Sequence, residues 1–124
     1  MIDISEVVAI HRILINQFGG NPGIRDLSAL ESALQRPFQT FDNRDLYASD
    51  LEKAAALTES LLRNHPFIDG NKRVGYTVLR LFLASKSFKL TANKEQKYDF
   101  IINVATGLLA FEEIVSWIEI HTSK

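Results

Sequence analysis

The nine residues from 65 to 73 read HPFIDGNKR and place several chemically active side chains next to one another. A neutral imidazole at His65 can accept the proton of a hydroxyl group near neutral pH. The carboxylate of Asp69 offers hard oxygen ligands, which suit Mg²⁺ held against phosphate oxygens. Arg73 adds a forked, permanently charged donor that fits phosphate. These groups predict the transfer of a phosphorus-containing group from a nucleotide to a hydroxyl.

The same segment predicts a loop that joins two helices. Pro66 disfavours helical geometry at the residue before it, so the preceding helix is expected to end at His65. Phe67 is expected to be an apolar anchor that fixes the loop on the core. Both Pro66 and Phe67 are therefore interpreted as structural residues, whereas His65 lies at the mouth of the loop.

The last residues of the segment predict an anion site at the start of the second helix. Gly70 allows the backbone to come close to a ligand. A helix is expected to begin near Asn71, and the first N–H groups of a helix have no acceptor within it. These groups and the positive end of the helix dipole favour an anion. The predicted phosphate-binding residues are Gly70, Asn71, Lys72 and Arg73.

Each of these features has an ordinary explanation when it is taken alone. A His-Pro pair commonly ends a helix, Asp-Gly commonly forms a turn, and basic residues in a first helical turn are commonly solvated. The joint pattern H-x-F-x-D-G-N-x-R fixes six positions, which chance produces on the order of once in fifty million starts. The combination therefore favours a functional site.

Apolar residues recur at helical spacing along most of the chain, which predicts an all-α fold. We expect a compact bundle of about six helices that forms one domain over residues 1–124. Residues 37–48, PFQTFDNRDLYA, lack this spacing, and the Asp42-Asn43 pair predicts a short extended flap or hairpin, the only strand-like segment. Helix starts are predicted at Ser5, Asp26, Asp50, Asn71 and Thr91, and a sixth helix is predicted over residues 110–121.

The composition narrows the class of protein. The chain has 124 residues and a net charge of −1, without the basic excess that is typical of nucleic-acid binders. Cysteine is absent, which excludes disulfides, thiolate nucleophiles and zinc–thiolate sites. Residues 1–6 carry two acids and no base, unlike a signal peptide, and no apolar run reaches membrane-spanning length. We therefore expect a cytoplasmic protein that binds neither nucleic acid nor a membrane.

The segment HPFIDGNKR resembles the Fic/Doc motif, whose general form is H-P-F-x-[D/E]-G-N-[G/K]-R. The early GGNPGIRD at residues 19–26, the flap before the motif helix and the helical pattern resemble the death-on-curing (Doc) branch over most of the chain. This resemblance implies that His65 is the general base, that Asp69 binds Mg²⁺ and that Arg73 holds phosphate. It also implies that the flap aligns the target segment as an edge strand can. The flap residues concerned are Phe38, Gln39, Thr40 and Phe41.

Resemblance to the Doc branch also implies partners and a biological role. It implies a toxin that uses Mg²⁺ and ATP, or another nucleoside triphosphate, to modify a hydroxyl on a host protein and so inhibit translation. A translation elongation factor is the implied class of target. The nearest match to the family's inhibitory pattern, TANKEQ at residues 91–96, starts a separate helix. The resemblance therefore implies a small antitoxin protein whose helix lies in an apolar groove of this chain.

Two chemistries remain open within this family. AMP-transferring Fic proteins usually carry a second arginine three residues after the first, where this chain has Tyr76. Lys72 replaces the more common glycine, as in Doc proteins that act as kinases, whereas Gly70 stands where those proteins commonly have alanine. Tyr76 favours phosphate transfer over AMP transfer, because an outer-phosphate clamp is lost. A third alternative is a non-catalytic module that binds a partner or a nucleotide.

Overall fold

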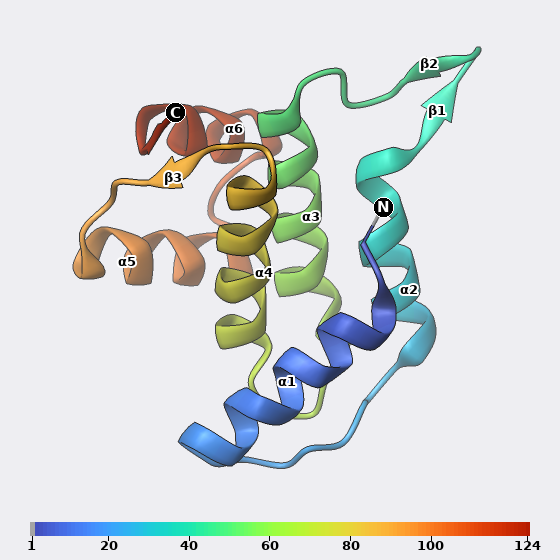
Figure 1. Ribbon diagram of the computed structural model, residues 1–124, viewed down its shortest axis with the longest axis vertical. Coiled ribbons are helices and arrows are strands. Elements are labelled where there is room, and N and C mark those ends of the chain that lie inside the picture. Colours follow the sequence, from blue (N-terminus) through green and yellow to red (C-terminus); the bar gives the residue numbers. More distant parts are fainter. Residues whose placement is uncertain (1) are drawn as a thin grey trace.

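The computed structural model describes residues 2–124, and within them the fold is a bundle of six α-helices with four short strands (Figure 1). The α-helices are α1 (Ile4–Phe18), α2 (Leu27–Gln35), α3 (Asp50–Asn64), α4 (Asn71–Ser85), α5 (Lys94–Ala105) and α6 (Phe111–Ile120). The other elements are the 3₁₀ helix η1 (Arg36–Phe38) and the strands β1 (Thr40–Phe41), β2 (Arg44–Asp45), β3 (Lys89–Leu90) and β4 (Thr122–Ser123). The predicted all-α architecture is confirmed. No helix within residues 2–124 combines the length and the apolar character that crossing a membrane requires.

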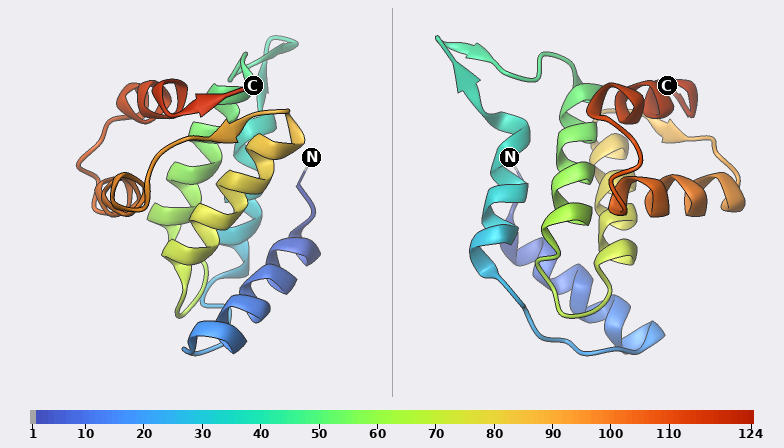
Figure 2. Two further views of the ribbon diagram at one scale, coloured as in Figure 1. Left: turned by 60° about the vertical axis from the view of Figure 1, so that its left-hand side comes forward. Right: turned by 180° about the vertical axis from the view of Figure 1, so that it is seen from behind.

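Helix α3 lies at the centre of the bundle. Its residues 54–62 are all buried, and it packs against α2, α4, α5 and α6. A helix that is covered on every side belongs in the interior, and its three consecutive alanines, 54–56, let the neighbouring helices come close. Gly75 of α4 also permits close packing, because a Cβ there would lie 2.7 Å from Cδ2 of Leu62. Figures 1 and 2 show α3 and α4 side by side.

One buried carboxylate ties α3 to the segment that precedes it. Glu59 accepts hydrogen bonds from Arg36 of η1 at 2.8 Å and from Arg63 of α3 at 2.7 Å. Arg36 also donates to the hydroxyl of Tyr47 at 2.9 Å. Burial opposes the charge on Arg36, but hydrogen bonds to Tyr47 and Glu59 outweigh burial and raise the pKa of the guanidinium. This cluster therefore fixes η1 and the base of the following hairpin against α3.

Strands β1 and β2 form the predicted hairpin. Thr40 pairs with Asp45, and Phe41 pairs with Arg44, in antiparallel register. The two turn residues have φ values of 53° and 62°, left-handed conformations that aspartate and asparagine tolerate. All four paired residues are exposed. In every view the hairpin lies at the opposite end of α3 from the 65–70 loop (Figures 1 and 2), and a helix of this length spans about 22 Å.

The structure corrects the prediction of a single strand-like segment, because β3 pairs antiparallel with β4 near the C-terminus. Thr91 continues from β3 and donates its N–H to the carbonyl of His121 at 2.7 Å, so it does not cap α5. Asn93 caps α5 instead, in a reciprocal pair of hydrogen bonds with Gln96. Pairing between segments far apart in the sequence thus moves the helix start, and residue spacing alone does not reveal it.

Two further helix starts differ from the prediction by one or two residues. Asp3 caps α1, because its carboxylate accepts the N–H of Ser5 at 2.9 Å and the hydroxyl of Ser5 at 2.8 Å. Ser49 caps α3 in a capping box, and Asp50 is already the first helical residue. The cap predicted at Asp26 is confirmed. At both starts, two residues that can cap a helix stand close together in the sequence. The residue that takes the extended backbone conformation becomes the cap, and the sequence alone does not show which one that is.

Candidate functional site

The loop between α3 and α4 begins with His65, whose imidazole is exposed. The last helical residue of α3 is Asn64, and His65, where the helix was predicted to end, is its C-cap, with a left-handed backbone conformation of φ 47° and ψ 59°. Such a conformation costs about 1–2 kcal/mol for a residue with a Cβ, so other contacts must hold it. Arg25 provides them, because its guanidinium donates to the carbonyls of Asn64 and His65, each at 2.6 Å.

The segment before α2 runs antiparallel to this loop and fixes its backbone. Residues 23–26 pair with residues 66–68 through backbone hydrogen bonds of 2.8, 3.0 and 3.1 Å. Ile24 and Phe67 form the antiparallel bridge within this pairing. The early segment 19–26 therefore lies beside the motif loop, and Figure 1 shows both along the lower edge of the molecule.

The predicted flap residues are not brought to this loop. The hairpin lies at the other end of α3, and residues 38–41 do not line the cleft into which His65 opens. Phe38 instead packs edge-on against Phe82 of α4, with ring centroids 6.4 Å apart. The hairpin therefore does not lie beside His65, and its predicted role in aligning a target segment stays a prediction. The extended segment that lies beside His65 is 19–26.

Helix α1 contributes two aromatic contacts to the site. The ring of His11 stacks on Phe67 with centroids 3.8 Å apart, and both side chains are buried. Nε2 of His11 donates to the carbonyl of Asp69 at 2.8 Å, since a carbonyl oxygen only accepts. The guanidinium of Arg73 lies 4.4 Å from the ring centroid of Phe18, a cation–π contact. The sequence did not predict that His11 contributes to the site, because its hydrogen-bond partner Asp69 is 58 positions away.

The carboxylate of Asp69 is exposed and lines the cleft. Its Oδ2 accepts the N–H of Asn21 at 2.8 Å, which orients the group. Within residues 2–124, no group of three or more His, Cys, Asp or Glu side chains could enclose a metal ion. A cation at Asp69 would take most of its ligands from water and phosphate, which is how Mg²⁺ commonly binds beside nucleotides. This carboxylate therefore fits the role of a Mg²⁺ ligand.

The start of α4 presents unpaired backbone donors to the cleft. Gly70 occupies the cap position with φ 83°, and no side chain caps the helix. The N–H of Val74 bonds to the carbonyl of Gly70 at 2.9 Å, so the three N–H groups before it have no acceptor within the helix. The side chain of Asn71 bonds instead to both backbone groups of Phe67, at 2.9 and 3.0 Å. Asn71 therefore closes the loop with its side chain and offers only its backbone N–H to an anion.

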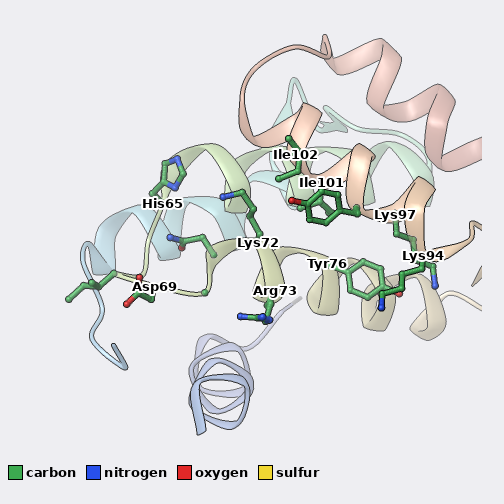
Figure 3. Close-up of a pocket in the computed structure, with 13 residues that line it drawn as sticks. His65, Asp69, Lys72, Arg73, Tyr76, Lys94, Lys97, Ile101 and Ile102 are labelled. Atoms are coloured by element: carbon green, nitrogen blue, oxygen red, sulfur yellow. The ribbon is translucent and has the colours of Figure 1, made fainter. Parts of the chain in front are cut away.

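A cleft of about 850 Å³ opens between the loop, α4 and α5 (Figure 3). His65 and the predicted metal and phosphate ligands all line it. The opposite wall comes from α5, whose lining residues are Lys94, Lys97, Tyr98, Ile101 and Ile102. Sequence reasoning missed this wall, because α5 is a separate helix without a recognisable motif, and only its packing beside α4 brings it to the site.

Proteins with related sequences match most of the chain. The Fic/DOC family model matches residues 1–83, which contain the loop, α1–α3 and most of α4. "Toxin Doc" from Mycolicibacterium smegmatis is 38% identical over 91 residues, which cover 72% of this chain and 70% of that protein. "Protein kinase doc" from Escherichia phage P1 is 27% identical over 110 residues, which cover 88% of this chain and 85% of that protein. Helices α5 and α6 lie beyond the family match.

Proposed function

This chain belongs to the Fic/DOC family, and on that premise we propose that it is a toxin that modifies a host protein. It transfers a phosphorus-containing group from a Mg²⁺-bound nucleoside triphosphate to a hydroxyl group. The observation that carries this proposal is the cleft, in which His65, Asp69 and Arg73 lie around the uncapped start of α4. A proton acceptor, a hard carboxylate and a phosphate clamp are the groups that such a transfer needs.

In the proposed reaction, His65 removes the proton from the attacking hydroxyl. The new oxygen–phosphorus bond forms as the bond between that phosphorus and the leaving nucleotide breaks, and the proton remains on the imidazole. The N–H groups of residues 71–73 and the guanidinium of Arg73 bind the phosphate oxygens on which negative charge grows. Asp69 would hold Mg²⁺, which supplies further neutralisation of phosphate charge when it is bound.

We favour phosphate transfer over AMP transfer. The phage relative carries the name of a protein kinase, and the match covers 85% of its length. In addition, the position three residues after Arg73 carries Tyr76 in place of a second arginine. AMP transfer is the second candidate, supported by the Fic-like Gly70. A non-catalytic binding module is the third, and the exposed imidazole at the mouth of the cleft argues against it.

The proposed target is a host protein of the translation elongation factor class. Its hydroxyl must approach His65, beside which segment 19–26 runs. Ile24 and Ile68 are 40% and 50% exposed there, and they offer apolar contact for a target chain. Any contact of the predicted flap residues 38–41 with the same target lies at the far end of α3 from the reacting hydroxyl.

We also propose an antitoxin partner, a small protein whose helix lies in an apolar groove of this chain. The proposal is supported by the name of the 38% identical relative, which is a toxin. Expression of the chain without a partner should then arrest growth, and His65→Ala should restore it. Normal growth at high yield of the unpartnered wild-type chain would contradict this role.

The reaction is tested with ATP that carries the label on either the γ- or the α-phosphate. The purified chain and its His65→Ala variant are incubated with Mg²⁺, cell lysate and one labelled ATP at a time. Transfer of the γ label alone, dependent on His65, is the expected result. Transfer of the α label would establish AMP transfer instead. If neither label is transferred with ATP or with the other nucleoside triphosphates, the binding-module alternative replaces the enzyme.

A further inference from the structure

The cleft carries more positive charge than the motif alone supplies. It is lined by the carboxylate of Asp69 and by four basic side chains: Lys72, Arg73, Lys94 and Lys97. Because the whole chain has a net charge of −1, positive charge is concentrated at this site. A cleft lined by one sign of charge focuses its field on a ligand of the opposite sign. The expected ligand is therefore an anion with more than one charged group.

The cations stand at two levels along α4. Lys72 and Arg73 belong to its first turn, whereas the ammonium of Lys97 lies 5.6 Å from the ring centroid of Tyr76. Tyr76 is three residues beyond Arg73, which places it about 4.5 Å further along the helix axis. Figure 3 shows Lys94 and Lys97 beside Tyr76, on the side of Arg73 that is remote from the motif loop.

The two lysines of α5 occupy positions that are unfavourable within the protein itself. Lys94 and Lys97 lie in the first turns of α5, near the positive end of the helix dipole, where a cation lowers stability. Within residues 2–124, none of the three ion pairs includes either lysine. Residues three apart share one face of a helix, and here that face lines the cleft. A bound anion would offset the charges of both lysines and the dipole of α5.

We propose that Lys97, with Lys94 beside it, is the second phosphate-binding group of this cleft. It binds the phosphate of the nucleoside triphosphate that lies furthest from the reacting phosphorus, while Arg73 and the start of α4 bind the reacting phosphate. The ring of Tyr76 positions the ammonium of Lys97. Helix α5 therefore supplies the positive charge that α4 lacks at position 76. The assignment rests on the proposed function, because it takes a nucleoside triphosphate as the occupant. Both lysines lie beyond the family match.

The test measures binding of Mg-ATP, and separately of inorganic phosphate, to the full chain by titration calorimetry. All variants carry His65→Ala, which prevents turnover. Lys97→Gln removes the charge but keeps a long polar side chain, and Lys97→Arg keeps the charge. Lys89→Gln is the matched control, because Lys89 is an exposed lysine of β3 outside the cleft. Equal melting temperatures establish that the variants fold alike.

We expect Lys97→Gln to weaken Mg-ATP binding roughly tenfold, the size of one charge-assisted phosphate contact. Binding of inorganic phosphate should stay within about twofold, because a single phosphate takes the uncapped start of α4. Lys97→Arg and Lys89→Gln should bind Mg-ATP as the parent does.

Three results would overturn the assignment in different ways. If Lys97→Gln binds Mg-ATP as tightly as the parent, Lys97 is not a ligand, and the proposed function stands. If Lys97→Gln and Lys89→Gln lose the same amount of affinity for Mg-ATP, the loss reflects the overall charge of the protein. In that case too, Lys97 is not a ligand. If the parent binds no nucleoside triphosphate at all, the proposed function fails, and the Lys97 assignment fails with it.

Discussion

The loop at one end of α3 and the hairpin at the other end differ in what holds them. The loop is bonded to residues far away in the sequence: Arg25 is 40 positions from His65, and His11 is 58 positions from Asp69. These bonds hold the backbone carbonyls of His65 and Asp69, the predicted general base and the predicted Mg²⁺ ligand. A group that acts on a reacting atom must be in place before the substrate arrives, and long-range contacts hold these groups in place here.

The hairpin is held mainly by contacts that are close in the sequence. Lys53 donates to Asp45 at 3.3 Å, eight positions away, and the N–H of Leu46 donates to the carbonyl of Gln39 at 2.9 Å, seven positions away. Its four paired residues are exposed, and Phe41 is 77% exposed. The contrast predicts that substitutions at the loop change the reaction, whereas substitutions in the hairpin change little beyond the hairpin itself.

The largest effect is expected at His65. His65→Ala should lower the rate of label transfer by roughly 10²–10⁴-fold, the usual contribution of a general base. Because the imidazole is exposed, the free energy of unfolding should change by less than about 0.5 kcal/mol. Transfer rates and urea unfolding measure the two quantities. If the variant still transfers label at the wild-type rate, His65 is not the general base.

The next largest effect is expected at Arg25, a positioning residue. Arg25→Ala removes two hydrogen bonds to the end of α3, so stability should fall by about 1.5 kcal/mol. Displacement of His65 should lower kcat by roughly 10- to 100-fold, while the Kd for Mg-ATP should stay unchanged. Arg25→Lys should recover part of kcat. Lost stability without any loss of kcat would limit Arg25 to a purely structural role and weaken the contrast between the two ends.

A smaller effect is expected at Gly70, whose φ of 83° is left-handed. Gly70→Ala should cost about 1 kcal/mol of unfolding free energy, because the added Cβ meets only an ordinary contact, 3.4 Å from Cδ1 of Ile15. Gly107→Ala is the matched control outside the loop, since Gly107 has φ 79° and open space around it. Urea unfolding should give similar losses for both. A much larger loss at Gly70 would mean that the loop tolerates no added atom.

The smallest effect is expected in the hairpin. Phe41→Ala should change the free energy of unfolding by less than about 0.5 kcal/mol, as is usual for an exposed residue. Labelling of lysate proteins should also stay unchanged, because the hairpin lies far from His65. If this variant binds Mg-ATP normally but labels its target poorly, the hairpin does dock the target, and the contrast between the two ends breaks down.

The sequence by itself determined the local features of the site. Pro66 places the end of α3 before His65, and Asn71 begins α4 where the pattern predicts. The Asp42-Asn43 pair likewise specifies the hairpin turn. Each of these features depends on backbone preferences and hydrogen bonds within a few residues, so a sequence pattern records them directly.

Only the tertiary structure decided which parts of the chain surround His65. A helix of about 22 Å carries the hairpin away from the loop, and the pairing of residues 23–26 with 66–68 brings the early segment beside it. Packing of α1 and α5 around α4 adds His11 and Lys97. Such contacts arise from burial of helix faces shared by the whole bundle. These long-range contacts produce no recognisable pattern in the sequence around the residues that make them.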